Sequence, residues 1–127
     1  MNETFISFYL KANRIHVFVD ALRGIGSPKY ISFMLKENGQ SLAMLPYDKK
    51  DFHSHRVPSS VYNGGKGMDV SSMKLCTMLA DMYNWEQERS YRVPGDIIPK
   101  QKIVLFYLTE AEEIKRNEEG QRWRIRR

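Results

Sequence analysis

Two histidines and an aspartate in the middle of the chain are the first candidates for chemistry. Asp51, His53 and His55 alternate along the sequence, so an extended segment would place all three side chains on one face. Two imidazoles and a carboxylate can bind a divalent transition metal. The same segment, from Lys49 to Arg56, could instead contact phosphate, with the histidines as hydrogen-bond donors. Polar connectors of this kind also occur without any ligand, so the spacing leaves the three interpretations open.

A glycine-rich stretch follows, and its backbone could bind an anion. Gly64, Gly65, Lys66 and Gly67 precede the clearest predicted helix, and the first turn of a helix carries free N–H groups and a partial positive charge. The stretch fits neither G-x-x-x-x-G-K-[ST] nor G-x-G-x-x-G. A surface loop with turn glycines is the plainer interpretation.

Nucleophilic catalysis finds no support in the sequence. The one cysteine, Cys76, falls on the apolar side of a predicted helix, where a thiol acts as a small hydrophobic group. No serine lies in a G-x-S-x-G motif. The acidic cluster at Glu110, Glu112 and Glu113 suits the start of a helix. We therefore lean against an enzyme and expect no cofactor.

Nucleic-acid binding requires cations interleaved with aromatic side chains. We expect the arginines and lysines to contact phosphates, and Tyr91 and Trp123 to stack on bases. On a strand, Tyr91 and Arg92 would point to opposite faces, so one face could not supply both. No helix-turn-helix, zinc-finger or RNP motif is present. The predicted nucleic-acid-binding residues are Arg89, Tyr91, Arg92, Lys100, Lys102, Arg122, Trp123 and Arg124.

Composition and charge fit one folded domain with a basic end. The 127 residues are 42% hydrophobic and 12% aromatic, which is too rich for a disordered chain. The net charge of +5 comes mostly from four arginines among residues 122–127. We expect residues 1–120 to form a single domain and residues 121–127 to form a disordered basic tail. The start of the chain does not resemble a secretory signal, and no stretch approaches the length of a membrane span.

The hydrophobic pattern predicts strands and helices in alternating groups. Asn38-Gly39 between two apolar runs predicts a hairpin with a type I′ turn. Ser71 or Ser72 can cap a helix whose buried face includes Leu75 and Leu79, and residues 109–112 match the capping box of a terminal helix. Residues 47–70 are predicted to be irregular. The expected strands are 4–10, 15–19, 30–35, 41–45, 90–93 and 103–108, with a short helix at 20–26 and a turn at 94–96.

This order of elements predicts an α+β fold. The expected architecture is a mostly antiparallel sheet built from hairpins, with two or three helices packed on one face.

Several short segments of the sequence together resemble those of a known group of proteins. They resemble a group of small uncharacterised bacterial proteins that are often encoded beside phage or integrative-element genes. The resemblance covers most of residues 15–108 and implies a cytosolic bacterial protein, with no activity attached. The segments that carry the resemblance are ALRGIGSPKYISFML (21–35), LAMLP (42–46), Lys74-Leu75-Cys76, Asn84-Trp85 and SYRVPG (90–95).

The sequence therefore favours a small, non-enzymatic, cytoplasmic binding or regulatory module, with nucleic acid as the leading partner. The alternative is a protein–protein module, an inhibitor or adaptor, that uses the 58–68 loop and a sheet edge. A metal-dependent enzyme built on Asp51, His53 and His55 is a weaker third hypothesis. No membrane partner is expected, and the oligomeric state is not determined by the sequence.

Overall fold

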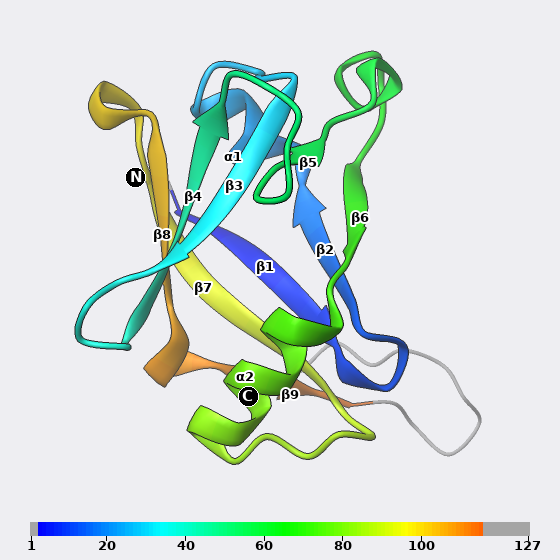
Figure 1. Ribbon diagram of the computed structural model, residues 1–127, viewed down its shortest axis with the longest axis vertical. Coiled ribbons are helices and arrows are strands. Elements are labelled where there is room, and N and C mark those ends of the chain that lie inside the picture. Colours follow the sequence, from blue (N-terminus) through cyan, green and yellow to red (C-terminus); the bar gives the residue numbers. More distant parts are fainter. Residues whose placement is uncertain (1–2, 116–127) are drawn as a thin grey trace.

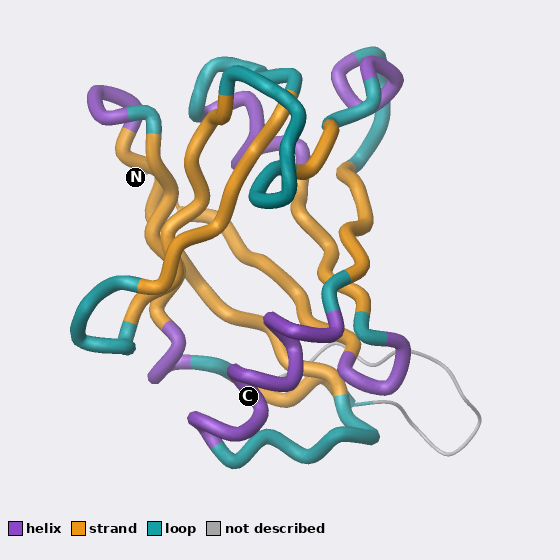
Figure 2. The backbone as a smooth tube through the Cα atoms, viewed as in Figure 1, coloured by secondary structure: helices purple, strands orange, loops and turns teal. Residues whose placement is uncertain are grey.

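One curved antiparallel sheet forms most of the molecule. The computed structural model describes residues 3–115, which form nine strands, two α-helices and four 3-10 helices (Figure 1; Figure 2). The strands are β1 Glu3–Tyr9, β2 Arg14–Phe18, β3 Tyr30–Leu35, β4 Ser41–Tyr47, β5 His55–Arg56, β6 Gly67–Ser71, β7 Ser90–Ile98, β8 Ile103–Tyr107 and β9 Glu112–Ile114. The helices are α1 Val19–Gly24 and α2 Met73–Tyr83, and the 3-10 helices are η1 Leu10–Ala12, η2 Ser59–Tyr62, η3 Pro99–Gln101 and η4 Leu108–Glu110.

The strand order is β5-β3-β4-β8-β7-β1-β2-β6, and β9 also pairs with β7. Because β1 occupies one edge of β7, the short β9 and β8 share the other edge, one after the other. The sheet curls until its two end strands, β5 and β6, approach each other, so it forms a nearly closed barrel (Figure 1).

The predicted α+β architecture, with two or three helices packed on one face of the sheet, is wrong. The described residues contain only two α-helices, and Figure 1 places α1 toward one end of the curved sheet and α2 at the other. The sheet instead covers its own inner face, because side chains from strands on both sides meet inside it. Ile6, Ile15, Leu42 and Phe106 are fully buried in this core. A sheet that closes on itself needs no helical layer to bury its apolar face.

The strongest local signals are confirmed. Strands β3 and β4 pair as the predicted hairpin, and α2 begins after Ser72, whose hydroxyl accepts a hydrogen bond from the Leu75 N–H at 3.2 Å. The hairpin turn differs from the predicted type I′, because only Gly39 has a positive φ, at 71°. Its five-residue connection needs a single left-handed residue where a two-residue type I′ turn needs two.

Two stretches have a different structure from the one predicted. The terminal helix at 109 is wrong, because the chain continues from η4 into β9 and pairs with residues 90–92 of β7. That pairing satisfies backbone groups on the part of the β7 edge that β8 does not reach. The irregular stretch 47–70 also contains two short strands, β5 and β6, which extend the sheet at its ends.

Strand β7 runs unbroken through Pro94-Gly95, where the sequence predicts a turn. Pro94 lies between the last residue paired with β9 and the first paired with β8, where a missing N–H is tolerated. At Gly95 the β8 backbone approaches so closely that a Cβ would collide with the Leu105 carbonyl oxygen and lie 2.6 Å from the Phe106 ring. Glycine here serves close strand packing rather than a turn.

Neither α-helix in residues 3–115 is long and apolar enough to cross a membrane. The predicted tail, residues 121–127, lies outside the described residues.

Replacing Gly95 by alanine tests the β7–β8 contact. We expect Gly95→Ala to lower the free energy of unfolding by about 3 kcal/mol, because the added methyl group meets backbone that cannot move without breaking the ladder. Urea denaturation measures this. Ser90→Ala, on the same strand, is the control and should change stability by less than about 0.5 kcal/mol. Equal stability of the Gly95→Ala variant and the wild type would contradict the close approach.

Candidate nucleic-acid interface

The outward side of strands β7, β1 and β2 carries aromatic and cationic side chains together. Alternate residues of a strand point to opposite faces. Ile6 and Phe8 of β1 are buried in the core, so Phe5 and Tyr9 point outward. Ile15 and Val17 of β2 are buried likewise, which directs their neighbours on that strand outward. We call the outward set Phe5, Tyr9, Arg14, Phe18 and Arg92 the outer face.

The strand register places these side chains in rows. In one row, Arg92 of β7 lies opposite Ser7 of β1, Ser7 lies opposite His16 of β2, and His16 lies opposite Asp69 of β6. The adjacent row contains Phe5, opposite Pro94 of β7. Cations and rings on neighbouring strands therefore stand next to each other.

Two arginines lie over aromatic rings of this face. The Arg92 Cζ is 4.7 Å from the centre of the Phe5 ring, and the Arg14 Cζ is 5.4 Å from the centre of the Tyr9 ring. Both distances allow cation–π attraction. Phe5 and Arg92 also line a shallow hollow of about 440 Å³, together with Phe18 and Lys66. The hollow offers two rings for stacking and two cations for phosphate contacts.

The carboxylates beside the outer face already have partners. Asp69 accepts a bond from the His16 imidazole at 2.8 Å and lies 3.9 Å from the Arg14 guanidinium. Asp20, which itself lines the hollow, accepts two hydrogen bonds through its Oδ1 atom, from the Thr4 hydroxyl at 3.0 Å and the Ala21 N–H at 2.8 Å. Within residues 3–115, neither cation of the hollow lies within 4.0 Å of a carboxylate. Their charges are therefore available to a ligand.

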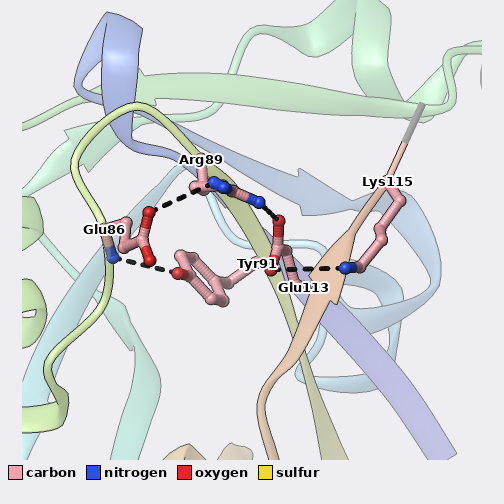
Figure 3. A network of polar contacts seen from close by, with 5 residues as sticks. All are labelled: Glu86, Arg89, Tyr91, Glu113 and Lys115. Carbon is pink, nitrogen blue, oxygen red and sulfur yellow. Dashed lines mark hydrogen bonds and ion pairs between the residues drawn. The ribbon is translucent and has the colours of Figure 1, made fainter. Parts of the chain in front are cut away.

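Arg89, the first predicted phosphate contact, is instead part of a polar network (Figure 3). Its guanidinium bonds to Glu113 of β9 and lies 3.3 Å from Glu86. Lys115 lies 3.9 Å from the other oxygen of Glu113. These carboxylates raise the pKa of Arg89 above its ordinary value, with the Glu113 hydrogen bond as the largest cause. Arg89 links β9 to the segment before β7, and its charge is already compensated.

Tyr91 points to the opposite side from Arg92, as the strand alternation predicts. Its ring stacks on Trp85 with centroids 4.8 Å apart and planes 13° apart, and Trp85 in turn lies 5.5 Å from Phe8 of the core. Its hydroxyl accepts a hydrogen bond from the Glu86 N–H at 2.9 Å (Figure 3). Tyr91 is therefore not placed to stack on a ligand at the outer face.

The remaining predicted contacts lie elsewhere. Lys100 belongs to η3 and Lys102 follows it, in the hairpin that joins β7 to β8, at the opposite end of β7 from Arg92 (gold in Figure 1). Arg122, Trp123 and Arg124 lie outside the described residues. Among the predicted residues that fall within residues 3–115, the structure brings Arg92 alone onto the outer face.

The glycine-rich loop does not reach a helix N-terminus, because β6 separates it from α2. Its glycines allow close backbone packing instead. A Cβ on Gly65 would lie 2.9 Å from the Val61 backbone, and one on Gly67 would lie 2.8 Å from the His16 ring. The Lys66 carbonyl accepts a bond from the Val19 N–H at 2.9 Å. This packing holds Lys66 beside the outer face, while Gly64 lies at the exposed tip.

The proposed metal ligands are not brought together. Both carboxylate oxygens of Asp51 are occupied, one by the His53 N–H at 2.7 Å and one by the Tyr47 hydroxyl at 2.9 Å. His53 and His55 line a separate hollow, where the ring of His55 lies 5.7 Å from that of Phe33. No group of three or more potential ligands occurs between residues 3 and 115.

Cys76 is buried in α2, as predicted for a core thiol. Burial raises its pKa to about 11, so the thiol stays protonated near neutral pH and is a poor nucleophile.

Four residues of the outer face were not predicted from the sequence: Phe5, Tyr9, Arg14 and Phe18. For β2 the signal was present, since inward Ile15 and Val17 imply outward Arg14 and Phe18. For β1 the pattern does not distinguish the two faces, because both faces of Thr4–Leu10 carry large apolar or aromatic side chains.

Comparisons with protein-family models, with curated proteins and with solved structures find no match for this chain.

The half-buried His55 should make stability depend on pH. Burial lowers its pKa below the ordinary 6.5, so the unfolded chain takes up a proton at a higher pH than the folded chain does. The contribution of the neutral His55 to the free energy of unfolding is therefore fully present above about pH 6.5, and it is lost as the pH drops below that value. We expect urea denaturation at about pH 7.5 and pH 5.5 to show this loss, and His55→Gln to reduce it. His53→Gln, which changes an exposed histidine, should retain the wild-type loss. An unchanged pH dependence in His55→Gln would contradict the assignment.

Proposed function

We propose that this chain is a small, non-enzymatic binding module whose outer face binds single-stranded nucleic acid. The observation that carries the proposal is the guanidinium of Arg92 over the Phe5 ring, beside Phe18 and Lys66. Single-strand binders combine rings on which bases stack with cations that follow the phosphates. A sheet surface is suited to this, because neighbouring strands present side chains at regular spacing.

Single-stranded rather than duplex nucleic acid suits this face. The rings lie on a sheet and in a shallow hollow, and bases within a duplex are not free to stack on them. Arginine side chains can stack on bases and contact phosphate, so a few cations suffice for modest affinity. The compartment we propose is the cytoplasm of a bacterium, on the strength of the sequence resemblance.

A protein partner remains the alternative. Its proposed site was the 58–68 loop with a sheet edge, and β6 does end the sheet. However, Val61 and Met68 of that loop are buried, and the Tyr62 hydroxyl donates to the Pro28 carbonyl at 2.7 Å. The apolar side chains of the loop are therefore used within the fold, which favours the outer face as the binding surface.

The nucleic-acid proposal is tested by fluorescence anisotropy of labelled oligomers of about 12 nucleotides, single- and double-stranded, at about 50 and 150 mM salt. We expect the single strand to bind more tightly, and both Arg92→Gln and Phe5→Ala to weaken binding about fivefold or more, because each removes a stacking or phosphate contact.

Arg89→Gln is the matched control, since this nearby arginine is already paired with two carboxylates. It should leave the affinity within about twofold. A second control, Arg122→Gln with Arg124→Gln, measures binding by the basic end of the chain. If Arg92→Gln and Arg89→Gln behave alike, or only the second control loses affinity, the outer face is not the binding surface.

A further inference from the structure

A second concave surface, separate from the outer face, gathers positive charge. It is a cleft of about 640 Å³ formed by the segment before β3, the loop between β4 and β5, and η2. We call it the basic cleft and define it by its three cations, Lys29, Lys50 and Arg56, all exposed. Its volume falls in the range of sites that hold a small molecule.

The charge in the basic cleft is unbalanced. Asp51 is the one carboxylate in its lining, which leaves an excess of two positive charges. Both oxygens of Asp51 already accept hydrogen bonds, from the Tyr47 hydroxyl and the His53 N–H. In the part of the chain that the structure describes, none of the three cations lies within 4.0 Å of a carboxylate. Three cations that share one cleft and have no carboxylate partner within 4.0 Å favour an anionic ligand.

The backbone around the cleft is fixed before any ligand binds. The Ser54 hydroxyl accepts from the Asp51 N–H at 2.9 Å and lies 3.2 Å from the Asp51 carbonyl, which closes the loop into a tight turn. Arg56 lies opposite Tyr30 in the β3–β5 ladder, and the Val57 N–H donates to the Lys29 carbonyl at 2.8 Å. Arg56 lies on β5, Lys29 directly precedes β3, and Lys50 directly precedes the turn at Asp51. All three cations are therefore on or next to hydrogen-bonded backbone, which lowers the entropic cost of binding.

We infer that the basic cleft binds a phosphate monoester, the group carried by a mononucleotide or by the 5′ end of a nucleic-acid strand. Arginine can bind two oxygens of such a group at once, and two lysines add point charges. The hydroxyls of Ser27 and Ser59 in the lining can donate to further oxygens. The ring of Tyr62, held by its bond to the Pro28 carbonyl, forms part of the wall. This inference does not depend on the proposed function of the outer face.

The test is isothermal titration calorimetry of the full chain with adenosine 5′-monophosphate, adenosine and inorganic phosphate, and with one oligonucleotide with and without a 5′ phosphate. We expect the monophosphate to bind and adenosine not to bind.

Lys50→Gln with Arg56→Gln should weaken monophosphate binding about tenfold or more, because two phosphate contacts are lost. Lys36→Gln with Lys74→Gln, exposed lysines outside the cleft, should leave it unchanged. Thermal unfolding checks that both double variants fold, and Lys29→Gln replaces the first if it does not.

The ligand arms identify the source of the phosphate. If adenosine 5′-monophosphate binds more tightly than the phosphorylated oligonucleotide, the ligand is a free nucleotide. If the phosphorylated oligonucleotide binds more tightly than the unphosphorylated one, the ligand is the 5′ end of a strand. Arg92→Gln should retain monophosphate binding, which separates this site from the outer face. Absence of monophosphate binding, equal binding of adenosine, or full binding by the cleft variants would overturn the inference.

Discussion

At Gly95 the backbones of β7 and β8 approach so closely that a Cβ would collide with the Leu105 carbonyl oxygen. Strand β7 pairs with β1 along one edge and with β9 and then β8 along the other. Within residues 3–115, it is the strand that joins the β5-β3-β4-β8 half of the sheet to the β1-β2-β6 half. Without a side chain at Gly95, the two halves can meet closely enough for their inner faces to share one core.

Neighbouring side chains of β7 point alternately into the core and out to the surface. Tyr91 points inward and stacks on Trp85 at the end of the sheet that α2 covers, while Arg92 points outward over Phe5. Arg89, just before the strand, is held by carboxylates from two segments. Three neighbouring residues of one short stretch thus have three different environments, and only Arg92 is available to a ligand at the outer face.

The sequence predicted features that depend on local pattern and missed those that depend on long-range pairing. The β3–β4 hairpin and the Ser72 cap of α2 follow from neighbouring residues, and both are confirmed. The β9 strand could not be predicted, because Glu112–Ile114 is recruited by an edge of β7 that local patterning does not reveal. Pro94-Gly95 is a common turn signal, and only the partner strands explain its extended conformation. Two of the three cations of the basic cleft lie in the segment Lys49–Arg56, which the sequence already indicated as a possible phosphate contact, and the fold adds Lys29.

The outer face is tested most directly by a backbone amide NMR titration of the ¹⁵N-labelled full chain with a single-stranded oligonucleotide that lacks a 5′ phosphate. We expect chemical-shift changes in β1, in β2, in the first half of β7 and around Lys66, with little change in β8 and η3. Changes confined to residues 121–127, or centred on Lys100 and Lys102, would contradict this expectation, because they would place binding away from the outer face.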